Sequence, residues 1–524
     1  MQLRQLAEKS AYQLESFRRE LWRLSVPRRR KRPGAVCNTP LKILFVTSEA
    51  TPFAKTGGLA DVAGSLPVAL RRRGHEVRVI LPAYRSVTTS GHPLKPVGPA
   101  FEIVLGATPV KVSIRRAQHA GVSFFFVECP AFFDRPALYG TPAGDYPDNM
   151  ERFTLFCRAV FTYLLQQKYR PDILHIHDWQ TSLVPVLLKT EQVNDPFFRS
   201  MASLLTIHNL GYQGIFPLSK LAQLGLPASL SRMDQLEYYG NLSLLKGGIV
   251  HADLLNTVSP SYCREIQQPG SGQGFDGLLR SRRRDLFGVL NGIDDQSWNP
   301  ATDPALSKGY SSTNLRGKRI CKQALQRELG LSVNDKIPLL AVVSRLDTQK
   351  GIDLIEELWP QLLQRELQFV LLGSGDQQQM AFWQERQREK TNRYAIGLEF
   401  DEQLSHRIFA AADCLLVPSR YEPCGLTQMI ALRYGALPIV RRTGGLADTI
   451  EDITALGKAG NGFVFSAPEP TALLAAIDRA LEFYARPALW RKLVKKGMEE
   501  DFSWDNSARR YEELYAQALM KRRT

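Results

Sequence analysis

The same six residues, Thr-Gly-Gly-Leu-Ala-Asp, occur twice in the chain, at 56–61 and again at 443–448. Each copy follows a short apolar run that is typical of a buried strand, 43–47 for the first copy and 436–440 for the second. An amphipathic run follows the first copy, as expected of a helix. Because two such strand–turn–helix units recur so far apart, the sequence predicts two similar α/β domains that face each other.

The first copy has the features of an anion-binding turn. Gly57 and Gly58 allow a ligand to approach the backbone closely, and the start of the following helix offers unpaired N–H groups. Lys55 adds a positive charge beside them. The spacing fits neither the dinucleotide-binding fingerprint nor the P-loop. A tight βα turn with a surface lysine explains the same residues, so this turn alone does not identify a chemistry.

Strand and helix patterns alternate through most of the chain, which predicts mostly parallel sheets with helices on both faces. The strands expected in the first half are 42–47, 76–81, 102–105, 110–116, 122–127, 172–176, 202–206 and 253–258. Its expected helices are 58–72, 149–168, 179–189 and 260–267. The second half is expected to have strands at 337–343, 367–372, 393–397, 413–417 and 436–440. Its expected helices are 351–364, 375–389, 402–411, 424–434, 470–484, 487–499 and 504–521.

This pattern divides the chain into five parts. A basic N-terminal arm spans 1–40, and a first Rossmann-like domain spans 41–300. The region 301–332 is predicted to be a linker, because residues 295–316 are polar, contain Pro300 and Pro304 and lack periodicity. The second Rossmann-like domain spans 333–503, and a final helix spans 504–524.

Composition excludes several classes of protein. No run of about 18 apolar residues occurs, so no transmembrane helix is predicted, and no apolar h-region near the start indicates secretion. The seven cysteines are scattered and show neither CxxC pairs nor zinc spacing, which favours reduced thiols and no metal site. We therefore expect a cytoplasmic location, or the plastid stroma if the arm is a targeting segment.

The net charge of +15 raises the question of nucleic-acid binding. Ten basic and three acidic residues lie in the arm, and outside it the cations are dispersed except at Arg280 and Arg282–Arg284. No nucleic-acid recognition motif occurs, and a phosphate-bearing substrate explains a mild excess of positive charge equally well. We expect no nucleic-acid partner, and expect the basic run 28–32 to contact a partner or a surface.

Ligands of open α/β sheets bind beyond the carboxyl ends of the strands, so the residues there are the candidates. Each has a structural explanation as well: His208 as a buried structural histidine, Asp178 as a helix cap, and Asn291 as part of a turn. Together, however, nearly every strand end carries polar or glycine residues. Arg345 and Lys350 offer two cations near each other, which suits a departing diphosphate.

The chain resembles the bacterial and plant glycogen and starch synthases. The motifs that carry the resemblance are Lys55-Thr-Gly-Gly-Leu-Ala-Asp61, His208-Asn209 with Tyr212-Gln213-Gly214, Ser344-Arg345 with Gln349-Lys350-Gly351, Ser419 to Gln428, and Arg441 to Asp448. The resemblance runs from about Leu41 to the C-terminus and does not cover the arm.

The resemblance implies a GT-B fold, with two Rossmann-like, doubly wound domains about a central cleft and a C-terminal helix that returns to the first domain. It implies transfer of glucose from ADP-glucose to the non-reducing end of an α-1,4-glucan (glycogen, amylopectin or amylose), with retention at the anomeric carbon. No cofactor and no metal are implied.

The resemblance also implies roles for residues of the second half. Arg345 and Lys350 resemble the pair that grips the donor diphosphate, and Glu422 resembles the carboxylate that contacts the glucosyl hydroxyls. The family often has tyrosine where this chain has Phe400, whose ring is still able to stack on adenine. Further donor-binding residues implied in this half are Gly373, Cys424, Gly425, Leu426 and Thr427.

In the first half, the resemblance implies that Lys55, Gly57 and Gly58 form the nucleotide-phosphate loop, with Asp61 close to the sugar. The remaining residues implied in this half are His208 and Asn209, which hold the glucosyl unit, Asp178 near them, and Asn291 on the donor side.

Two other interpretations stay open on the sequence alone. Another retaining GT-B enzyme, sucrose-related or phosphorylase-like, is disfavoured by the opening Lys55-Thr-Gly-Gly motif. A glucan-binding or granule-associated scaffold with reduced catalysis is disfavoured by the intact Arg345, Lys350 and Glu422. For the mechanism, Glu422 as a covalent nucleophile is the alternative to departure of the diphosphate through an oxocarbenium-like state.

Overall fold

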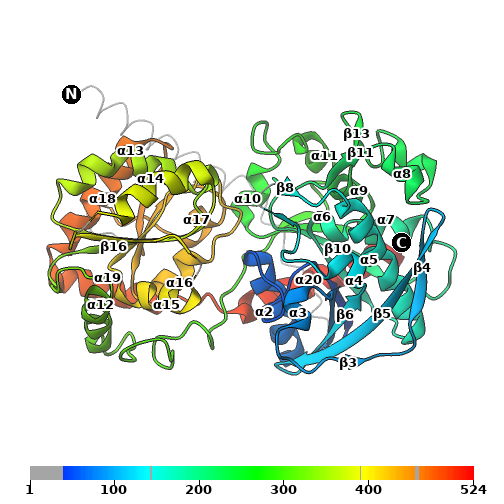
Figure 1. The fold of residues 1–524 in the computed structure, drawn as a ribbon, viewed down its shortest axis with the longest axis horizontal. Coiled ribbons are helices and arrows are strands. Elements are labelled where there is room, and N and C mark those ends of the chain that lie inside the picture. The colour runs from blue at the N-terminus through cyan, green and yellow to red at the C-terminus, as the bar shows by residue number, and fades with distance from the viewer. Residues whose placement is uncertain (1–38, 142–143, 390, 400, 455–459, 524) are drawn as a thin grey trace, which may run out of the picture. The chain divides into compact units, whose positions relative to one another are not determined.

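A computed structural model describes residues 39–141, 144–389, 391–399, 401–454 and 460–523. The basic run at 28–32 and Phe400 therefore lie outside the described residues. Chain contacts separate the segment 1–39 from a unit formed by Pro40–Thr524. Within this second unit, two sheets are each flanked by helices (Figure 1).

The first sheet has the strand order β15-β14-β10-β9-β1-β2-β6-β5-β3, with β4 paired to β5. Pairs from β15 through β6 are parallel, whereas β3, β4 and β5 pair antiparallel at one edge. Its strands are β1 (Lys42–Val46), β2 (Glu76–Pro82), β3 (Lys95–Pro96), β4 (Phe101–Leu105), β5 (Thr108–His119), β6 (Val122–Glu128), β9 (Ile173–His177), β10 (Ala202–Ile207), β14 (Leu254–Thr257) and β15 (Leu286–Gly288).

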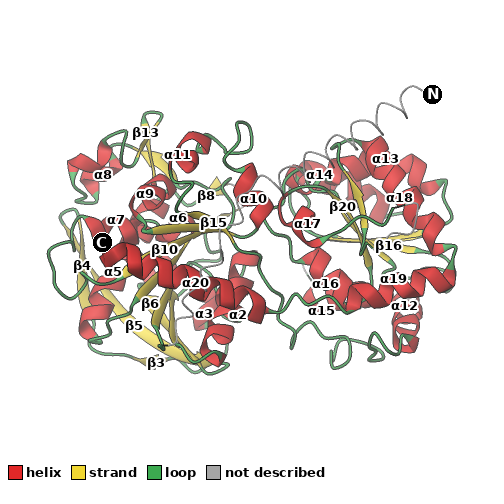
Figure 2. Cartoon of the chain, turned by 180° about the vertical axis from the view of Figure 1, so that it is seen from behind, coloured by secondary structure: helices red, strands yellow, loops and turns green. Residues whose placement is uncertain are grey.

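Helices cover both faces of this sheet, as Figure 2 shows from behind. The longer ones present an apolar stripe to the sheet, so that β1 is fully buried beyond its first residue. The helices of this half are α2 (Gly58–Arg72), α3 (Arg85–Thr88), α4 (Pro130–Phe133), α5 (Asn149–Gln166), α6 (Asp178–Thr181), α7 (Leu183–Lys189), α8 (Lys220–Gln223), η1 (Ala228–Ser231), α9 (Leu244–His251), α10 (Pro260–Glu265) and α11 (Asp276–Ser281).

Two small antiparallel sheets decorate the first half. Strands β11 (Ile215–Pro217), β13 (Asn241–Ser243) and β12 (Glu237–Tyr238) form one of them, with β13 in the middle. Strands β7 (Gly140–Thr141) and β8 (Gly144–Asp145) form the other. Both were absent from the sequence prediction, because strands of two or three residues leave no periodic signal.

The second sheet is entirely parallel, in the order β18-β17-β16-β19-β20-β21. Its strands are β16 (Leu339–Val343), β17 (Gln368–Leu372), β18 (Tyr394–Gly397), β19 (Cys414–Val417), β20 (Leu437–Arg441) and β21 (Phe463–Phe465). The helices that belong with it are α12 (Arg316–Glu328), η2 (Thr348–Lys350), α13 (Ile352–Leu363), α14 (Gln377–Gln387), α15 (Glu402–Ala411), α16 (Thr427–Arg433), α17 (Gly444–Thr449), α18 (Pro470–Tyr484) and α19 (Pro487–Met498).

The last helix, α20 (Trp504–Arg523), packs on the first sheet although the second sheet precedes it in the chain. Tyr511 and Tyr515 are buried there, and the Tyr515 hydroxyl lies 2.9 Å from Nδ1 of His175 in β9. Arg73 at the end of α2 pairs with Glu512 at 2.7 Å. The predicted return of the final helix to the first domain is confirmed.

Three sequence predictions differ from the structure. The helix expected over 424–434 begins only at Thr427, because Gly425 has a φ of +71° that no helix accepts. The helix expected over 179–189 is two helices that meet at Ser182. The expected linker contains α12, which is anchored to the second half by Lys318: its Nζ donates to the carbonyls of Ala410, Ala412 and Tyr434.

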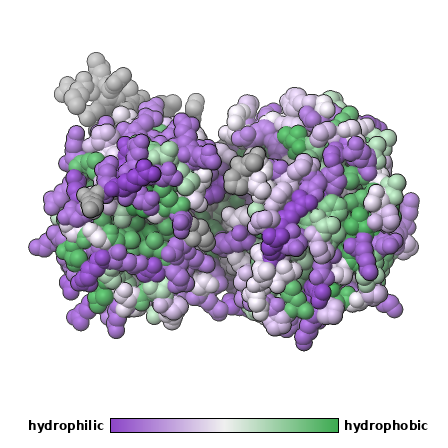
Figure 3. Space-filling model, viewed as in Figure 1, coloured by the Kyte–Doolittle hydropathy of each residue, from purple (hydrophilic) through white to green (hydrophobic). Residues whose placement is uncertain are grey.

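On the face of the molecule in Figure 3, polar residues cover much of the surface and apolar residues gather in smaller groups. Among the helices that the structure describes, none combines the length and the apolar character needed to cross a bilayer.

Candidate active site

Candidate residues from both sheets lie at the carboxyl ends of parallel strands, as expected for this architecture. Arg345 follows β16, and Glu422 follows β19. His208 follows β10, and the first Thr-Gly-Gly turn follows β1. A hydrogen bond joins the two groups, since one Nη of Arg345 lies 3.3 Å from the hydroxyl of Tyr212.

Lys350 and Glu422 form a partly buried ion pair in the second half. Lys350 Nζ lies 2.6 Å from Oε2 of Glu422, and the same oxygen accepts a hydrogen bond of 2.9 Å from the Ser419 hydroxyl. Gly351, at φ +69°, makes this pairing sterically feasible, because a Cβ there would lie 2.3 Å from the carbonyl oxygen of Pro418. The loops after β16 and β19 are therefore held against each other, and they carry the cation and the carboxylate.

Arg345 is less constrained than Lys350. Its side chain is 48% exposed and lies 3.4 Å from the Asp347 carboxylate, while that carboxylate also caps the backbone N–H of Lys350 at 3.0 Å. Because the contacts with Tyr212 and Asp347 do not use all five N–H donors of the guanidinium, Arg345 still has donors available for an anion. Arg345 and Lys350 thus lie on one short loop, as the sequence predicted, and only the lysine pairs with Glu422.

The first Thr-Gly-Gly turn is held by Glu49, a residue that the sequence analysis did not identify. The Glu49 carboxylate accepts hydrogen bonds from the N–H groups of Thr56 and Gly57 and from the Thr56 hydroxyl, the last at 2.6 Å. The Tyr139 hydroxyl donates to it as well, at 2.6 Å. Burial raises the pKa of Glu49. Glu49 therefore occupies the amides of Thr56 and Gly57, which precede Gly58, the first residue of α2.

The first turn has free space beside its two glycines. A Cβ on Gly57 would meet nothing within 4 Å, and one on Gly58 would meet only Leu426 Cδ1, at 3.7 Å. Lys55 pairs with Asp61 at 2.7 Å on the exposed side of the turn. Burial raises the pKa of Asp61 against the opposing effect of Lys55. Packing inside the protein therefore does not require glycine at either position.

His208 and Asp178 interact, but through the histidine backbone. Oδ1 of Asp178 accepts the N–H of His208 at 2.7 Å, and the His208 ring nitrogen Nε2 lies 3.0 Å from Nδ1 of His177. Burial raises the pKa of Asp178 to about 7 and lowers that of His208 to about 3. Asp178 has a φ of +55°, so it is not the helix cap that the sequence also allowed. His208 is neutral at pH 7.

The segment 424–427 is a tight loop that leads into α16. Cys424 is buried, and burial raises the pKa of its thiol to about 12, so the thiol is not a nucleophile near neutral pH. Gln428 holds the loop from below, because its Nε2 donates to the carbonyls of Cys424 at 3.1 Å and Gly425 at 2.9 Å. Leu426 is the residue of this loop that reaches Gly58 of the first turn.

Two candidates, Gly373 and Asn291, are packed against other parts of the protein. Gly373 lies under the loop after β16, where a Cβ would come within 1.9 Å of the Ser344 carbonyl oxygen. Asn291 is buried, and its backbone N–H is directed at Cys424. Within the described residues, the side-chain oxygen of Asn291 has no hydrogen-bond partner. Asn209 uses its side-chain oxygen to accept the N–H of Gly211, at 2.9 Å.

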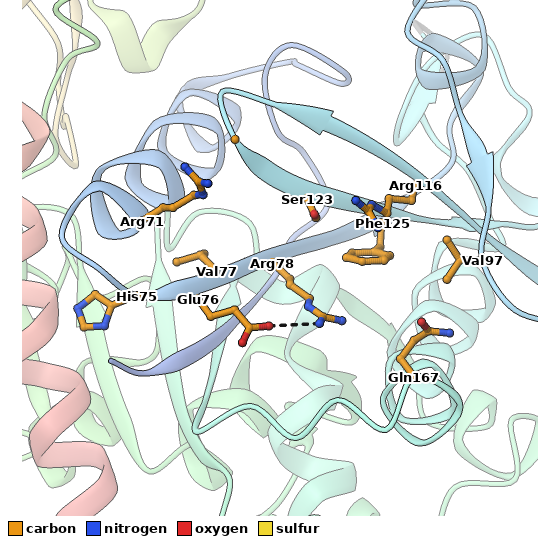
Figure 4. A pocket seen from close by; sticks show the side chains of 11 residues that line it. Arg71, His75, Glu76, Val77, Arg78, Val97, Arg116, Ser123, Phe125 and Gln167 are labelled. Atoms are coloured by element: carbon orange, nitrogen blue, oxygen red, sulfur yellow. Dashed lines mark hydrogen bonds and ion pairs between the residues drawn. The ribbon is translucent and has the colours of Figure 1, made fainter. Parts of the chain in front are cut away.

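A cavity of about 320 Å³ lies elsewhere, at the amino end of β2 (Figure 4). Arg71, Arg78 and Arg116 line it, and Arg78 pairs with Glu76 at 3.2 Å. It is on the opposite end of the strands from every candidate above, so it is not part of this site. Across the described part of the chain, no three His, Cys, Asp or Glu side chains are grouped so as to hold a metal ion.

Comparison with known proteins gives these contacts a context. Residues 42–281 match the family model described as "Starch synthase catalytic domain", and 327–497 match "Glycosyl transferases group 1". The chain is 50% identical to the glycogen synthase of Syntrophotalea carbinolica over 479 residues, which covers 91% of this chain and 99% of that protein. The chain belongs to the glycogen synthase family.

Other relatives agree with the family. The glycogen synthase of Moorella thermoacetica is 46% identical, over 93% of this chain and 98% of that protein. Among solved structures, the catalytic domain of starch synthase IV from Arabidopsis thaliana, bound to ADP and acarbose, superposes with a TM-score of 0.86 at 37% identity, covering 92% of this chain and all of that one. Like other members of the glycogen synthase family, the chain is a glycosyltransferase that transfers glucosyl units to a glucan.

The fold comparison extends beyond the family. Sucrose-phosphate synthase from Thermosynechococcus elongatus superposes with a TM-score of 0.58 at 20% identity, over 91% of this chain and 98% of that one. At that identity the likeness shows the shared fold alone, and it confirms the expected GT-B architecture of two Rossmann-like halves.

Proposed function

We propose that the chain uses ADP-glucose as its donor and extends the non-reducing end of an α-1,4-glucan, with retention at the anomeric carbon. The observation that carries this proposal is the pairing of Lys350 with Glu422 at 2.6 Å, beside Arg345 and opposite the open glycines of the first turn. Two cations and a backbone without side chains suit a diphosphate. The related starch synthase bound to ADP and acarbose supports the same nucleotide and glucan chemistry here.

In this proposal, charge accumulates on the diphosphate as the glycosidic bond breaks, and Arg345 and Lys350 stabilise it. The acceptor hydroxyl attacks from the face that the diphosphate leaves, and the departing phosphate takes its proton. Glu422 accepts from Lys350 and Ser419 on a single oxygen, Oε2. A carboxylate neutralised in this way suits hydrogen bonding to glucosyl hydroxyls better than nucleophilic attack.

His208 and Asn209 are proposed to hold the glucosyl unit from the first half, together with Asp178. The low pKa of His208, about 3, results from burial and keeps the ring neutral. A neutral imidazole is a directional hydrogen-bond partner for a sugar and adds no charge to an oxocarbenium-like state. Asp178 orients the His208 backbone through the 2.7 Å hydrogen bond. Lys55, Asp61 and the 424–427 loop are proposed to complete the donor site.

The remaining assignments are proposals that follow from the same pattern. We place the first domain at 41–300 and the second at 333–503, with 301–332 between them. A cytoplasmic location accords with bacterial relatives of the kind named above. Contact of the basic run 28–32 with a partner or a surface remains a prediction.

The experiment is a transfer assay with purified protein. ADP-glucose and UDP-glucose, labelled in the glucosyl unit, are each incubated with glycogen, amylopectin and amylose. We expect ADP-glucose to label the glucan with a kcat/KM well above that for UDP-glucose. Because the new units are at non-reducing ends, β-amylase should release the label as maltose. Comparable kcat/KM with UDP-glucose would refute the donor assignment. Glucan binding without any transfer would instead support a scaffold.

A further inference from the structure

The small sheet β11-β13-β12 carries the most exposed aromatic side chain among the described residues. Tyr239, in the turn between β12 and β13, is 80% exposed. Its backbone has a φ of +48°, which side-chain-bearing residues rarely adopt. Tyr212, on the approach to β11, is 52% exposed. We call the surface formed by Tyr212, Gln213, Tyr238, Tyr239 and Gln273 the tyrosine rim.

Stability does not account for Tyr239. A left-handed position in a two-stranded turn favours glycine or asparagine, which adopt it at little cost. A bulky side chain there is strained, and a ring that is mostly in water gains little from burial. Its nearest ring is Tyr238, 4.7 Å away edge to face. Strained, exposed aromatic residues of this kind are typical of ligand-binding positions.

A second strained residue supports the same surface. Gln273, at φ +49°, belongs to a glycine-rich loop that reaches the turn. Its carbonyl oxygen accepts the Tyr238 hydroxyl at 3.1 Å and the Gln213 side-chain amide at 2.8 Å. Of the five described non-glycine residues with positive φ, Tyr239 and Gln273 therefore both adjoin Tyr238, the first along the chain and the second through the hydrogen bond. Tyr239 and Gly240 form a tight two-residue turn between the paired Tyr238 and Asn241, and backbone strain of the kind found at Tyr239 and Gln273 concentrates at functional sites.

The tyrosine rim is continuous with the candidate active site. Gln213 is the neighbour of Tyr212, whose hydroxyl contacts Arg345 at 3.3 Å. The next residue, Gly214, packs against Trp179, because a Cβ there would come within 2.5 Å of its indole ring. A ligand whose end lies at Arg345 and Glu422 thus meets aromatic and amide groups as it leaves the site.

We propose that the tyrosine rim binds the acceptor glucan beyond its reacting end, with Tyr239 as the stacking platform. Sugar rings present an apolar C–H face that packs on an aromatic ring, and their hydroxyls suit the amide of Gln213. The rim residues are uncharged, which fits a neutral polysaccharide rather than the charged donor. This inference rests on the proposed function, and it adds where the acceptor chain lies.

Tyr239→Asn and Tyr239→Trp test the proposal. Asparagine removes the ring and suits the left-handed backbone, so we expect a melting temperature equal to or above that of the wild type. We expect the Kd for maltoheptaose, measured by calorimetry without donor, and the KM for glycogen to rise about tenfold, the loss of one stacking contact worth about 1.4 kcal/mol. The KM for ADP-glucose stays within about twofold. Tyr239→Trp keeps an aromatic ring at this position and is expected to bind glucan as tightly as the wild type.

Val104→Ala, at a position 54% exposed on β4, is the matched control and leaves both constants unchanged. Unchanged maltoheptaose affinity in Tyr239→Asn overturns the inference, and so does a fall in melting temperature in both Tyr239 variants. The calorimetric measurement is independent of transfer. If the wild type binds maltoheptaose through Tyr239 but transfers no glucose, the proposed function fails and the tyrosine rim stands.

Discussion

The two Thr-Gly-Gly-Leu-Ala-Asp turns have the same sequence and different surroundings. In the first, Glu49 from the same half accepts the amides of Thr56 and Gly57, and the glycines face open space. In the second, the glycines pack against the loop that carries Glu422. The carboxylate that accepts the Gly444 amide, at 2.8 Å, is Glu265 of α10 in the first half.

The second turn connects the two halves through hydrogen bonds of Thr443, Gly444 and Asp448 to Glu265 and Ser261, a set of contacts that we call the fastener. Asp448, the last residue of its motif, accepts both the N–H and the hydroxyl of Ser261 at 2.7 Å. The corresponding Asp61 of the first turn pairs only locally, with Lys55. The glycines of the first turn therefore face open space, while those of the second pack against the loop that carries Glu422. The shared sequence does not fix the backbone shape, since Gly57 has a φ of −158° and its counterpart Gly444 a φ of +43°. The partners of each turn determine its use.

The largest effect is expected at the two cations of the loop after β16, one of which pairs with Glu422 on the loop that the second turn holds. Lys350→Ala and Arg345→Ala should lower kcat by roughly 10²–10³, about 3–4 kcal/mol of barrier, because both cations act most strongly on the departing diphosphate. Steady-state kinetics with ADP-glucose measures this, with the exposed Lys336→Ala as control. A folded Lys350→Ala enzyme within about threefold of wild-type kcat would sink the assignment.

The next effect separates the two turns by their glycines. A Cβ on Gly445 would lie 2.0 Å from the carbonyl oxygen of Cys424, so Gly445→Ala must displace the 422–424 loop. We expect a loss of about 3 kcal/mol in the free energy of unfolding, together with reduced kcat. Urea denaturation measures the first. A Gly445→Ala protein as stable as the wild type would contradict the role of the second turn as a packed support.

Removing the carboxylate of the fastener should have a smaller effect. Glu265→Ala leaves the Gly444 amide and the Thr443 hydroxyl without their acceptor, which costs about 2 kcal/mol of unfolding free energy. Limited proteolysis should then cut between the halves more rapidly. The exposed Glu499→Ala is the control. Equal proteolysis rates for Glu265→Ala and wild type would show that the fastener does not hold the halves.

A pH-dependent effect is expected near the first turn, at Asp178. Its folded pKa of about 7 exceeds the unfolded value of 3.8, so the folded state binds more protons and the contribution to stability is lost as pH rises through about 7. Asp178→Asn keeps the acceptor for His208 and has no such titration. Its unfolding free energy relative to wild type should rise by up to about 1.4 kcal/mol per pH unit between pH 5 and 7. Urea denaturation with no change in this difference would exclude the shift.

The smallest effect on stability is expected at the first turn itself. Gly57→Ala adds a methyl group where nothing lies within 4 Å, so unfolding free energy should change by less than about 0.5 kcal/mol. The KM for ADP-glucose should rise nonetheless, because the methyl group occupies the space proposed for the donor. If the KM is unchanged, the first turn is not a donor-binding turn, and the contrast with Gly445 is only one of packing.

The alternation of apolar runs was enough to predict both halves, and helices 58–72, 402–411 and 470–484 match the structure to the residue. Errors occur where tertiary contacts override local pattern. The helix after β19 starts late because Gly425 is left-handed. The expected linker hides α12, whose Lys318 is buried among carbonyl oxygens. A lysine-rich segment gives no sign in sequence that its charges will be used internally.

The candidate site shows the same limit. Arg345, Lys350 and Glu422 were singled out because loops at strand ends have positions that the fold dictates. Glu49 and Glu265 were not, although both organise a Thr-Gly-Gly turn. Glu49 lies three residues beyond the end of the first strand, which is a usable signal. Glu265 lies far from 443–448 in the sequence, and only the folded chain brings it there.

The return of α20 to the first half also sets an order of events during protein synthesis. A ribosome makes Tyr511 and Tyr515 after the whole second half, yet both are core residues of the first. N-terminal domains generally fold first as a chain emerges. In this chain the first half is unable to complete its fold until the second half and α20 have been translated. Until then, the surface that α20 covers is exposed. A premature stop codon anywhere in the second half therefore removes α20 as well and leaves that surface of the first half uncovered.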